Sequence, residues 1–204
     1  MSTSRLESFS DGVIAVAATL LVLNLVVPTP GTQELARALG RRWPEYAAYA
    51  TSFATIGIIW INHHVVIGRL READHPILIL NLLVLLTIGL LPFATALFAA
   101  YLNRPHGQHL AAAVYAGAFL LMSVAFAVLN WVILMRKSTL LRTAMSDEER
   151  RRILLRFTTG LGPYAIATGL AFVSQYATLA ICGALALFYA LPVAAGVTRE
   201  PRAG

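Results

Sequence analysis

The chain has 204 residues, of which 58% are hydrophobic and only 13% are charged, whereas charged residues make up about 25% of an ordinary soluble domain. This composition excludes a soluble protein, because the polar residues that would cover its surface are missing, and it is typical of an integral membrane protein. The formal net charge of +6 does not indicate a nucleic-acid partner, since the arginines cluster between hydrophobic runs, where membrane topology accounts for them.

Six hydrophobic stretches are long enough to be membrane-spanning helices. A bilayer core needs roughly 20 mainly apolar residues per helix, and the sequence supplies them at 10–28, 46–68, 77–102, 110–135, 157–175 and 177–197. We therefore predict an all-α integral membrane protein with six transmembrane helices in a single domain over residues 1–204. The last two spans touch at Gln175 and Tyr176, so we expect them to form a tight helical hairpin.

The first span has two different faces. At about 100° per residue, its long apolar side chains share a narrow sector with Gly12 beside it and Thr19 on its flank, while Asp11 points almost the opposite way; the sector holds Val16, Leu20, Leu23 and Val27. Periodicity alone assigns this stripe equally well to a surface that faces lipid or to packed core.

Helix breakers and caps mark the ends of several elements. Pro28 and Pro30 end the first span, Pro44 stands where the second helix begins, and Pro105 follows the third span. Residues 31–43 are expected to form a short interfacial helix. In the segment 145–157, Ser146 and Glu149 have the spacing of a capping box, which predicts a short helix leading into the fifth span.

Polar side chains inside the second and third spans require partners. His63 and His64 point about 100° apart on a helix, so they cannot bind one metal ion together without help from elsewhere, and a hydrogen-bonded role near Trp60 and Asn62 is favoured. Asn81 needs a partner from another span. With Asp11 and His64 near the same end of the bundle, we expect a shared polar cluster. We find no enzyme motif, and we expect no cofactor and no resident metal.

The distribution of basic residues predicts the orientation. If both termini and the segments 69–76 and 136–156 lie on one side, that side collects twelve of the sixteen Lys and Arg residues, namely Arg5, Arg69, Arg71, Arg136, Lys137, Arg142, Arg150, Arg151, Arg152, Arg156, Arg199 and Arg202. We therefore expect both termini to be cytoplasmic and the protein to lie in the cell (inner) membrane. The arginines of 145–157 are read chiefly as this topology signal, with binding to anionic lipid head groups as the alternative.

Several motifs resemble one family. Arg5, Phe9, Ser10 and Asp11 spell R-x-x-x-F-S-D before Gly12 and a helix with T-L-L-V-L, and further agreement comes from Trp60, Asn62, His63 and His64, from Asn81, and from Leu91, Pro92 and Phe93. This pattern is similar to the signature of the lysosomal and bacterial potassium channels of the transmembrane-protein-175 family. The similarity covers the first three spans well and the others through hydropathy.

The resemblance implies a channel without a re-entrant pore loop, in which the first helix of each six-span unit lines a central pore. A single unit resembles the bacterial form, which implies a homotetramer with potassium as the permeant ion. The family's hydrophobic constriction falls on Val16, with Leu20, Leu23 and Val27 along the same stripe and Thr19 at a pore-side hydroxyl position. Other members often have Ile or Leu in place of Val16, so the narrowest ring is expected to be wider in this chain or shifted towards Leu20.

Ser10 and Asp11 are then expected to bind His64, Asn81 or their neighbours, which would fix the rotation of the first helix; the alternative is that the motif only stabilises the fold. A secondary transporter is a rival function, since Pro92 and the run Gly160, Gly162 and Pro163 are possible helix breaks. A non-conducting membrane scaffold is the other alternative.

Overall fold

The computed structural model describes residues 3–28 and 34–196, with side chains up to residue 190. Pro30, Arg199, Arg202 and the last residue of the predicted sixth span lie outside the described residues. The described part is helical and contains no β-strand. Its elements are α1 (Thr3–Leu20), the 3-10 turn η1 (Leu21–Asn24), α2 (Leu35–Arg41), α3 (Trp43–Gly68), α4 (His75–Gly89), α5 (Leu91–Tyr101), α6 (Gln108–Trp131), the π-helical η2 (Val132–Arg136), the 3-10 turn η3 (Ser138–Leu140), α7 (Asp147–Thr158), α8 (Leu161–Leu170) and α9 (Gln175–Gly196).

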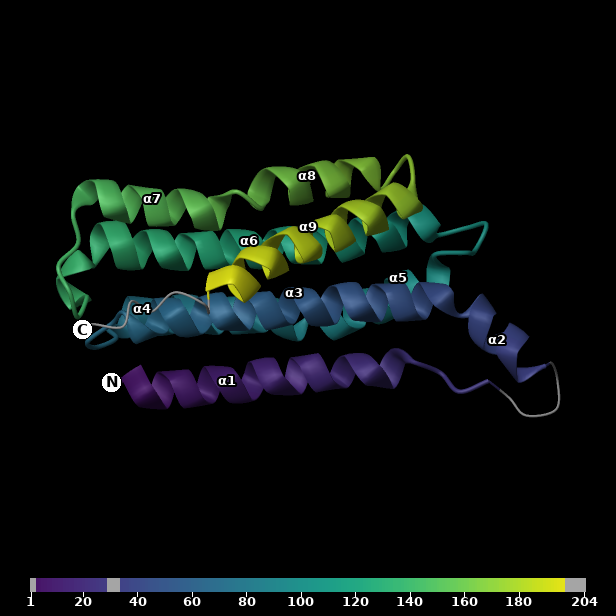
Figure 1. Cartoon of the computed structure of the whole chain (residues 1–204), viewed down its shortest axis with the longest axis horizontal. Helices are drawn as coiled ribbons and strands as arrows, with labels where there is room; N and C mark the ends of the chain where they lie inside the picture. Colours follow the sequence, from purple (N-terminus) through teal and green to yellow (C-terminus); the bar gives the residue numbers. More distant parts are fainter. Residues whose placement is uncertain (1–2, 29–33, 197–204) are drawn as a thin grey trace.

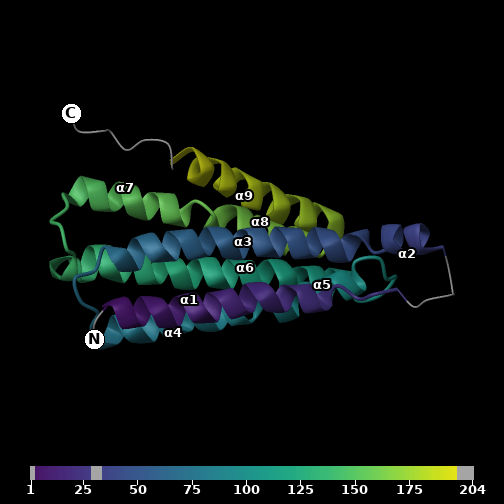
Figure 2. The ribbon, with the colours of Figure 1, turned by 60° about the horizontal axis from the view of Figure 1, so that its bottom comes forward.

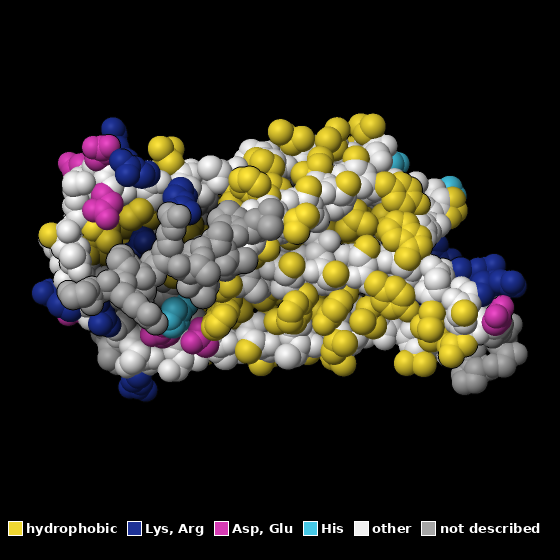
Figure 3. Space-filling view, in the orientation of Figure 1, with side chains coloured by type: hydrophobic (Ala, Val, Ile, Leu, Met, Phe, Trp, Pro, Cys, Tyr) yellow, Lys and Arg dark blue, Asp and Glu magenta, His cyan; other side chains and the backbone are white. Residues whose placement is uncertain are grey.

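The long helices run along the long axis of an elongated bundle (Figure 1). Hydrophobic side chains cover its middle, while Lys, Arg, Asp and Glu gather towards the two ends (Figure 3). Within the described residues, four helical stretches are long and apolar enough to cross a membrane: Thr3–Asn24, Trp43–Gly68, His75–Tyr101 and Gln108–Arg136. This arrangement is that of a multi-pass membrane protein.

The first helix ends earlier than expected. The α-helix stops at Leu20 and tightens into η1, after which residues 25–28 are not helical. The Asn24 side chain donates from Nδ2 to the backbone oxygen of Pro92, 3.2 Å away. The predicted span 10–28 is therefore corrected to a helix that begins at Thr3 and whose last turn is held by a contact with α5.

The third predicted span, 77–102, contains two helices. Pro92 has no backbone N–H, so the helical hydrogen bond that this position would donate is missing. The chain passes from α4 to α5 at Leu90, whose own N–H bonds to the oxygen of Thr87 at 3.3 Å. The helical path continues past this interruption to Tyr101.

The fifth predicted span, 157–175, also differs from the continuous helix expected there. The chain forms α7, breaks at Thr159 and Gly160, and resumes as α8, which ends at Leu170. Ten residues of helix rise about 15 Å, roughly half of a hydrocarbon core. Sequence hydropathy does not see the break, because apolar residues continue on both sides of it.

Short helices form at both ends of the bundle. Helix α2 lies within the predicted interfacial segment 31–43. At the other end, Ser146 caps α7 by accepting a hydrogen bond from the backbone N–H of Glu149 at 3.2 Å. The predicted short helix before the fifth span is thus present.

A clasp of loop contacts holds the end of the bundle at which α1 begins. The residues after α3 pair with the segment after η3, where Arg71 N donates to Leu140 O and Arg142 N donates to Arg69 O, both at 2.8 Å. Arg142 also donates from Nη2 to Thr3 Oγ1 at 3.3 Å. The clasp joins α1, the α3–α4 connection and the segment after α6.

Asp74 strengthens this end of the bundle in two ways. Its carboxylate caps α4 by accepting from Ile77 N at 3.2 Å, and it pairs with Lys137 Nζ at 2.7 Å. The hydrogen bond from Lys137 lowers the pKa of Asp74, with a smaller contribution from the Ile77 N–H. The charged carboxylate is therefore more stable in the folded chain than in the unfolded one.

Replacing Asp74 with Asn keeps a side chain that caps helices well but removes the charge. We expect the variant to be less stable than the wild type by about 0.5–1 kcal/mol at pH 7. Because the folded pKa lies below the unfolded value of about 3.9, the difference is complete above that value and disappears as the pH falls through the folded pKa. Unfolding free energies of both proteins in detergent at pH 7 and at low pH test this, and a difference that persists at low pH contradicts it.

Candidate functional site

Helix α1 lies at the edge of the bundle beside α3 and α4 (Figures 1 and 2). In its most apolar 18-residue window only 28% of the residues are buried, against 44% in each of the other three spanning stretches. One face alone packs against the chain's own core, through Leu6, Ser10, Ile14, Ala17 and Leu21. The opposite face of α1 is left uncovered by the single chain.

The packed face of α1 is fixed by a buried hydrogen-bond network. Ser10, His63 and Asn81 come from α1, α3 and α4, and each is fully buried. Asn81 lies in the middle, with Oδ1 2.7 Å from His63 Nε2 and Nδ2 3.0 Å from Ser10 Oγ. Such groups cannot be satisfied by lipid, so each requires the others.

The direction of each bond in this network follows from its neighbour. Ser10 donates its hydroxyl proton to the backbone oxygen of Leu6 at 2.8 Å, so towards Asn81 it acts as the acceptor. Asn81 therefore donates from Nδ2 and presents Oδ1 to His63, whose Nε2 must carry a proton. The chain of donors and acceptors ties one rotational setting of α1 to α3 and α4.

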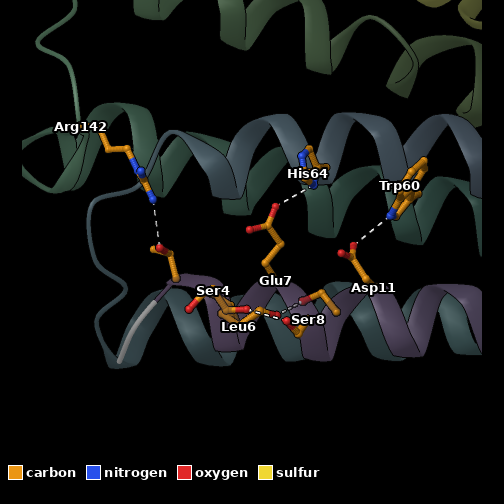
Figure 4. Close-up of polar contacts among 10 residues, drawn as sticks. Ser4, Leu6, Glu7, Ser8, Asp11, Trp60, His64 and Arg142 are labelled. Carbon is orange, nitrogen blue, oxygen red and sulfur yellow. Dashed lines mark hydrogen bonds and ion pairs between the residues drawn. The ribbon is translucent and has the colours of Figure 1, made fainter.

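A second set of contacts joins α1 to α3 nearer the surface (Figure 4). Glu7 Oε1 lies 2.7 Å from His64 Nδ1, and Trp60 Nε1 donates to Asp11 Oδ1 at 2.9 Å. The partners are four residues apart on each helix, and the two helices run in opposite directions. These contacts form two successive rungs between the helices.

The uncovered face of α1 carries the apolar stripe. Val16 is 56% exposed, Leu20 44%, Leu23 73% and Val27 82%. Leu23 belongs to η1 and Val27 to the non-helical residues that follow, so the stripe continues beyond the α-helix itself. Thr19 is also exposed, and its hydroxyl donates to Val16 O at 2.9 Å, which leaves the oxygen lone pairs facing outward.

The expected shared cluster of Asp11, His64 and Asn81 is corrected by the structure. His63, rather than His64, reaches Asn81, and Asp11 and His64 belong to the outer rungs. Adjacent helical residues point about 100° apart, so only one of the two histidines can enter the buried network. The sequence could not tell which one, because the rotation of α3 is set by its neighbours.

The other motif residues lie elsewhere. Phe9 and Arg5 are exposed on α1, about two and three turns before Val16, and on the same side as Gly12. Asn62 lies on a different side of α3, where it lines a cavity next to α6 and α7. Over residues 3–28 and 34–190, no group of three or more His, Cys, Asp or Glu side chains is placed to hold a metal ion.

Glu7 is a site residue that the sequence analysis missed. It lies just before the first predicted span, where a charged residue is ordinarily exposed to solvent. The available signal was the matched spacing of Glu7 and Asp11 on one helix and of Trp60 and His64 on the other. Such i, i+4 pairs lie on one face of each helix and can meet across an interface.

The fold and this site define a multi-pass α-helical membrane protein whose amino-terminal helix is anchored along one face and uncovered along the other. Comparison with known proteins supplies the family. The family model for the "Endosomal/lysosomal potassium channel TMEM175" matches residues 5–92, the region that contains the anchoring network. A potassium channel of Streptomyces collinus is 43% identical over 202 residues, which cover 98% of each chain.

Solved structures agree with the sequence relatives. The crystal structure of a lysosomal potassium-selective channel TMEM175 homolog from Chamaesiphon minutus matches with a TM-score of 0.83 at 37% identity, covering 93% of this chain and 97% of that one. The Endosomal/lysosomal proton channel TMEM175 of Bos taurus is 31% identical over 95% of this chain and 42% of its own length. The chain belongs to the TMEM175 family, which is a family of ion channels and not of enzymes.

Proposed function

We propose that the protein is a subunit of a potassium channel and that the exposed stripe of α1 lines its ion path. The observation that carries this proposal is the pair of opposite faces on α1, one tied down by a buried polar network and the other apolar and uncovered. Several copies arranged around an axis would bring the stripes together. By analogy with single-unit relatives, the assembly is a homotetramer of six-span subunits in the inner membrane, with both termini cytoplasmic.

The proposed constriction consists of Val16, Leu20, Leu23 and Val27 from each subunit. A potassium ion must shed part of its hydration shell to pass such rings, and sodium, which holds water more tightly, is penalised more. Apolar rings also close a pore by dewetting. Selectivity is modest because no cage of carbonyl oxygens replaces the lost water, although the outward lone pairs of Thr19 compensate for part of it.

The anchoring network gives the amino-terminal motif its role in this mechanism. Ser10, through Asn81 and His63, sets the rotation of α1, and the rungs of Glu7 and Asp11, one turn apart, hold it against α3. Because the face of α1 that carries Ser10 is fixed, the helix presents the stripe in one direction. Arg5 lies on the same side of α1 as the stripe, closer to the amino terminus, and faces the entrance of the proposed pore.

Potassium flux in liposomes tests the function itself. We expect purified protein to dissipate a potassium gradient without any coupled substrate and at rates far above those of a carrier. Flux that requires a second ion favours a transporter, for which the breaks at Pro92 and Gly160 would be the candidate sites. Proton flux without potassium flux makes this chain resemble the animal relatives in its permeant ion, and no flux indicates a scaffold.

A further inference from the structure

A cavity of about 510 Å³ lies on the side of α3 that faces away from α1. Its walls come from α3, in the middle of the bundle, and from α6, α7, α8 and α9; α7 and α8 form the edge opposite α1 (Figure 1). This volume lies within the range of sites that hold small organic ligands. The proposed ion path does not use this cavity, because its residues are on the opposite side of the subunit.

The cavity has two arginines at one end, and the rest of its lining is mainly apolar with some Thr, Ser, Asn and Tyr side chains. Along α3 it extends from Arg69, just beyond the end of the helix, inward to Thr55, a distance of about 21 Å at 1.5 Å per residue. Arg156 of α7 joins Arg69 at the mouth, whereas aromatic and aliphatic side chains such as Phe126 and Tyr164 line the inner part. The site therefore matches a molecule with an anionic head and a hydrocarbon tail.

Arg69, at the mouth, lacks a full set of hydrogen-bond partners among the described residues. Nη1 of Arg69 is buried and has no hydrogen-bond partner among the described residues. Burial lowers the pKa of Arg69; the nearby charge of Glu149 opposes this shift, and the like charge of Arg156 adds to it. A half-buried cation with an unused buried donor and a like-charged neighbour is stabilised by a bound anion.

The position of Arg69 is set by the backbone. The clasp described above pairs Arg69 O with Arg142 N at 2.8 Å, so the side chain starts from a fixed point beside the mouth. Arg156 lies one turn before the break that separates α7 from α8, and Gly160 at that break lines the same cavity. The break thus forms part of the cavity wall, next to Tyr164 and Tyr189.

We propose that this cavity binds one membrane lipid with a net-anionic phosphate head group, which Arg69 and Arg156 contact while an acyl chain occupies the apolar interior. Basic pockets between transmembrane helices bind such head groups in other proteins. The ligand is amphipathic, because an anion alone would leave the apolar part of the cavity unfilled and a hydrocarbon chain alone would leave the two arginines without an anion. A zwitterionic lipid fits less well, since its cationic group would lie near two guanidinium groups.

Native mass spectrometry of the detergent-purified channel tests the proposal, with phosphatidylglycerol and phosphatidylcholine of identical acyl chains as the probes. We expect phosphatidylglycerol to bind about tenfold more tightly than phosphatidylcholine. Arg69→Gln and Arg156→Gln should each remove most of this preference. The matched control is Arg151→Gln, which makes the same charge change on α7 at a residue that does not line the cavity and should bind like the wild type.

Two further binding experiments distinguish a bound lipid from a bound free anion. Ser123→Trp fills the cavity from α6 and should weaken phosphatidylglycerol binding although both arginines remain. Excess inorganic phosphate should fail to displace the lipid. Equal affinity for the two lipids, displacement by phosphate alone, or an effect of Arg151→Gln as large as that of Arg156→Gln would each overturn the proposal. Arg156 is exposed on its helix, so its variant tests the site even if the Arg69 variant fails to fold.

Discussion

Replacing Val16 with Asn is expected to increase the potassium conductance and to reduce the preference for potassium over sodium. An amide in the constriction replaces part of the lost hydration for either ion, so the barrier falls, and it falls more for sodium. A barrier lower by about 0.7–1.4 kcal/mol raises the rate roughly three- to tenfold. Val and Asn have similar helix propensities, so α1 itself should tolerate the change. Single-channel recording in planar bilayers with mixed potassium and sodium measures both effects.

Val22→Asn is the matched control for this experiment. Val22 is 48% exposed, close to the 56% of Val16, but it lies about 120° away from the stripe around the helix axis. The same chemical change should therefore leave conductance and selectivity near the wild type. An unaltered Val16→Asn channel, or an equal effect at position 22, contradicts the proposed constriction. The same substitution at Leu20 shows whether the narrowest ring is shifted by one turn.

Replacing Asn81 with Leu is expected to destabilise the fold by about 1–3 kcal/mol. The change leaves His63 Nε2 and Ser10 Oγ buried without their shared partner, and an unsatisfied buried group costs about 1–3 kcal/mol. Interhelical hydrogen bonds in membranes contribute about 0.6 kcal/mol on average, which favours the lower half of the range. Unfolding in mixed micelles, followed by circular dichroism, gives the free energy.

Asn130→Leu is the control for the loss of the Asn81 side chain. Asn130 is also fully buried, but its Nδ2 donates to Phe126 O within the same helix, α6. Among the described residues, the same substitution therefore removes no hydrogen bond between helices, and it should cost less. A larger loss at Asn130 than at Asn81 contradicts the view that the network holds three helices together.

A triple variant separates the two roles of the network. Ser10→Ala, His63→Phe and Asn81→Leu together replace all three polar groups with apolar ones, which can be nearly neutral for stability. We expect stability to return towards the wild type while potassium conduction stays impaired, because α1 is no longer held in one rotation. Normal conduction by a stable triple variant would mean that the motif only stabilises the fold.

The features that the sequence predicted well depend on local chemistry. Pro44 and Ser146 mark helix starts because a proline needs no N–H bond in the first turn and a serine hydroxyl replaces a missing acceptor. Asn81 was identified as a residue that needs a partner from another span, since no lipid atom satisfies an amide. Family membership followed from the amino-terminal motif and from Trp60, Asn62, His63 and His64.

The features that the sequence missed depend on how the helices pack. Whether His63 or His64 enters the network is decided by the rotation of α3, which hydropathy does not report. The breaks at Leu90 and at Thr159 and Gly160 fall inside apolar runs, so hydropathy does not show them; only Pro92 and the run Gly160, Gly162 and Pro163 indicated possible breaks at these places. The cavity at Arg69 and Arg156 is assembled from five helices, and no stretch of sequence contains its outline.

Thiol accessibility on α1 tests the central claim most directly. Leu20→Cys and Val22→Cys, each made with Cys182→Ser, place a thiol on the stripe and off it; the native Cys182 is buried. Silver ions, a thiol-reactive cation that can follow potassium, should block the potassium current irreversibly at position 20 and leave the current at position 22 unchanged. A current that silver leaves intact at position 20 but blocks at position 22 would place the ion path along another face of the helix.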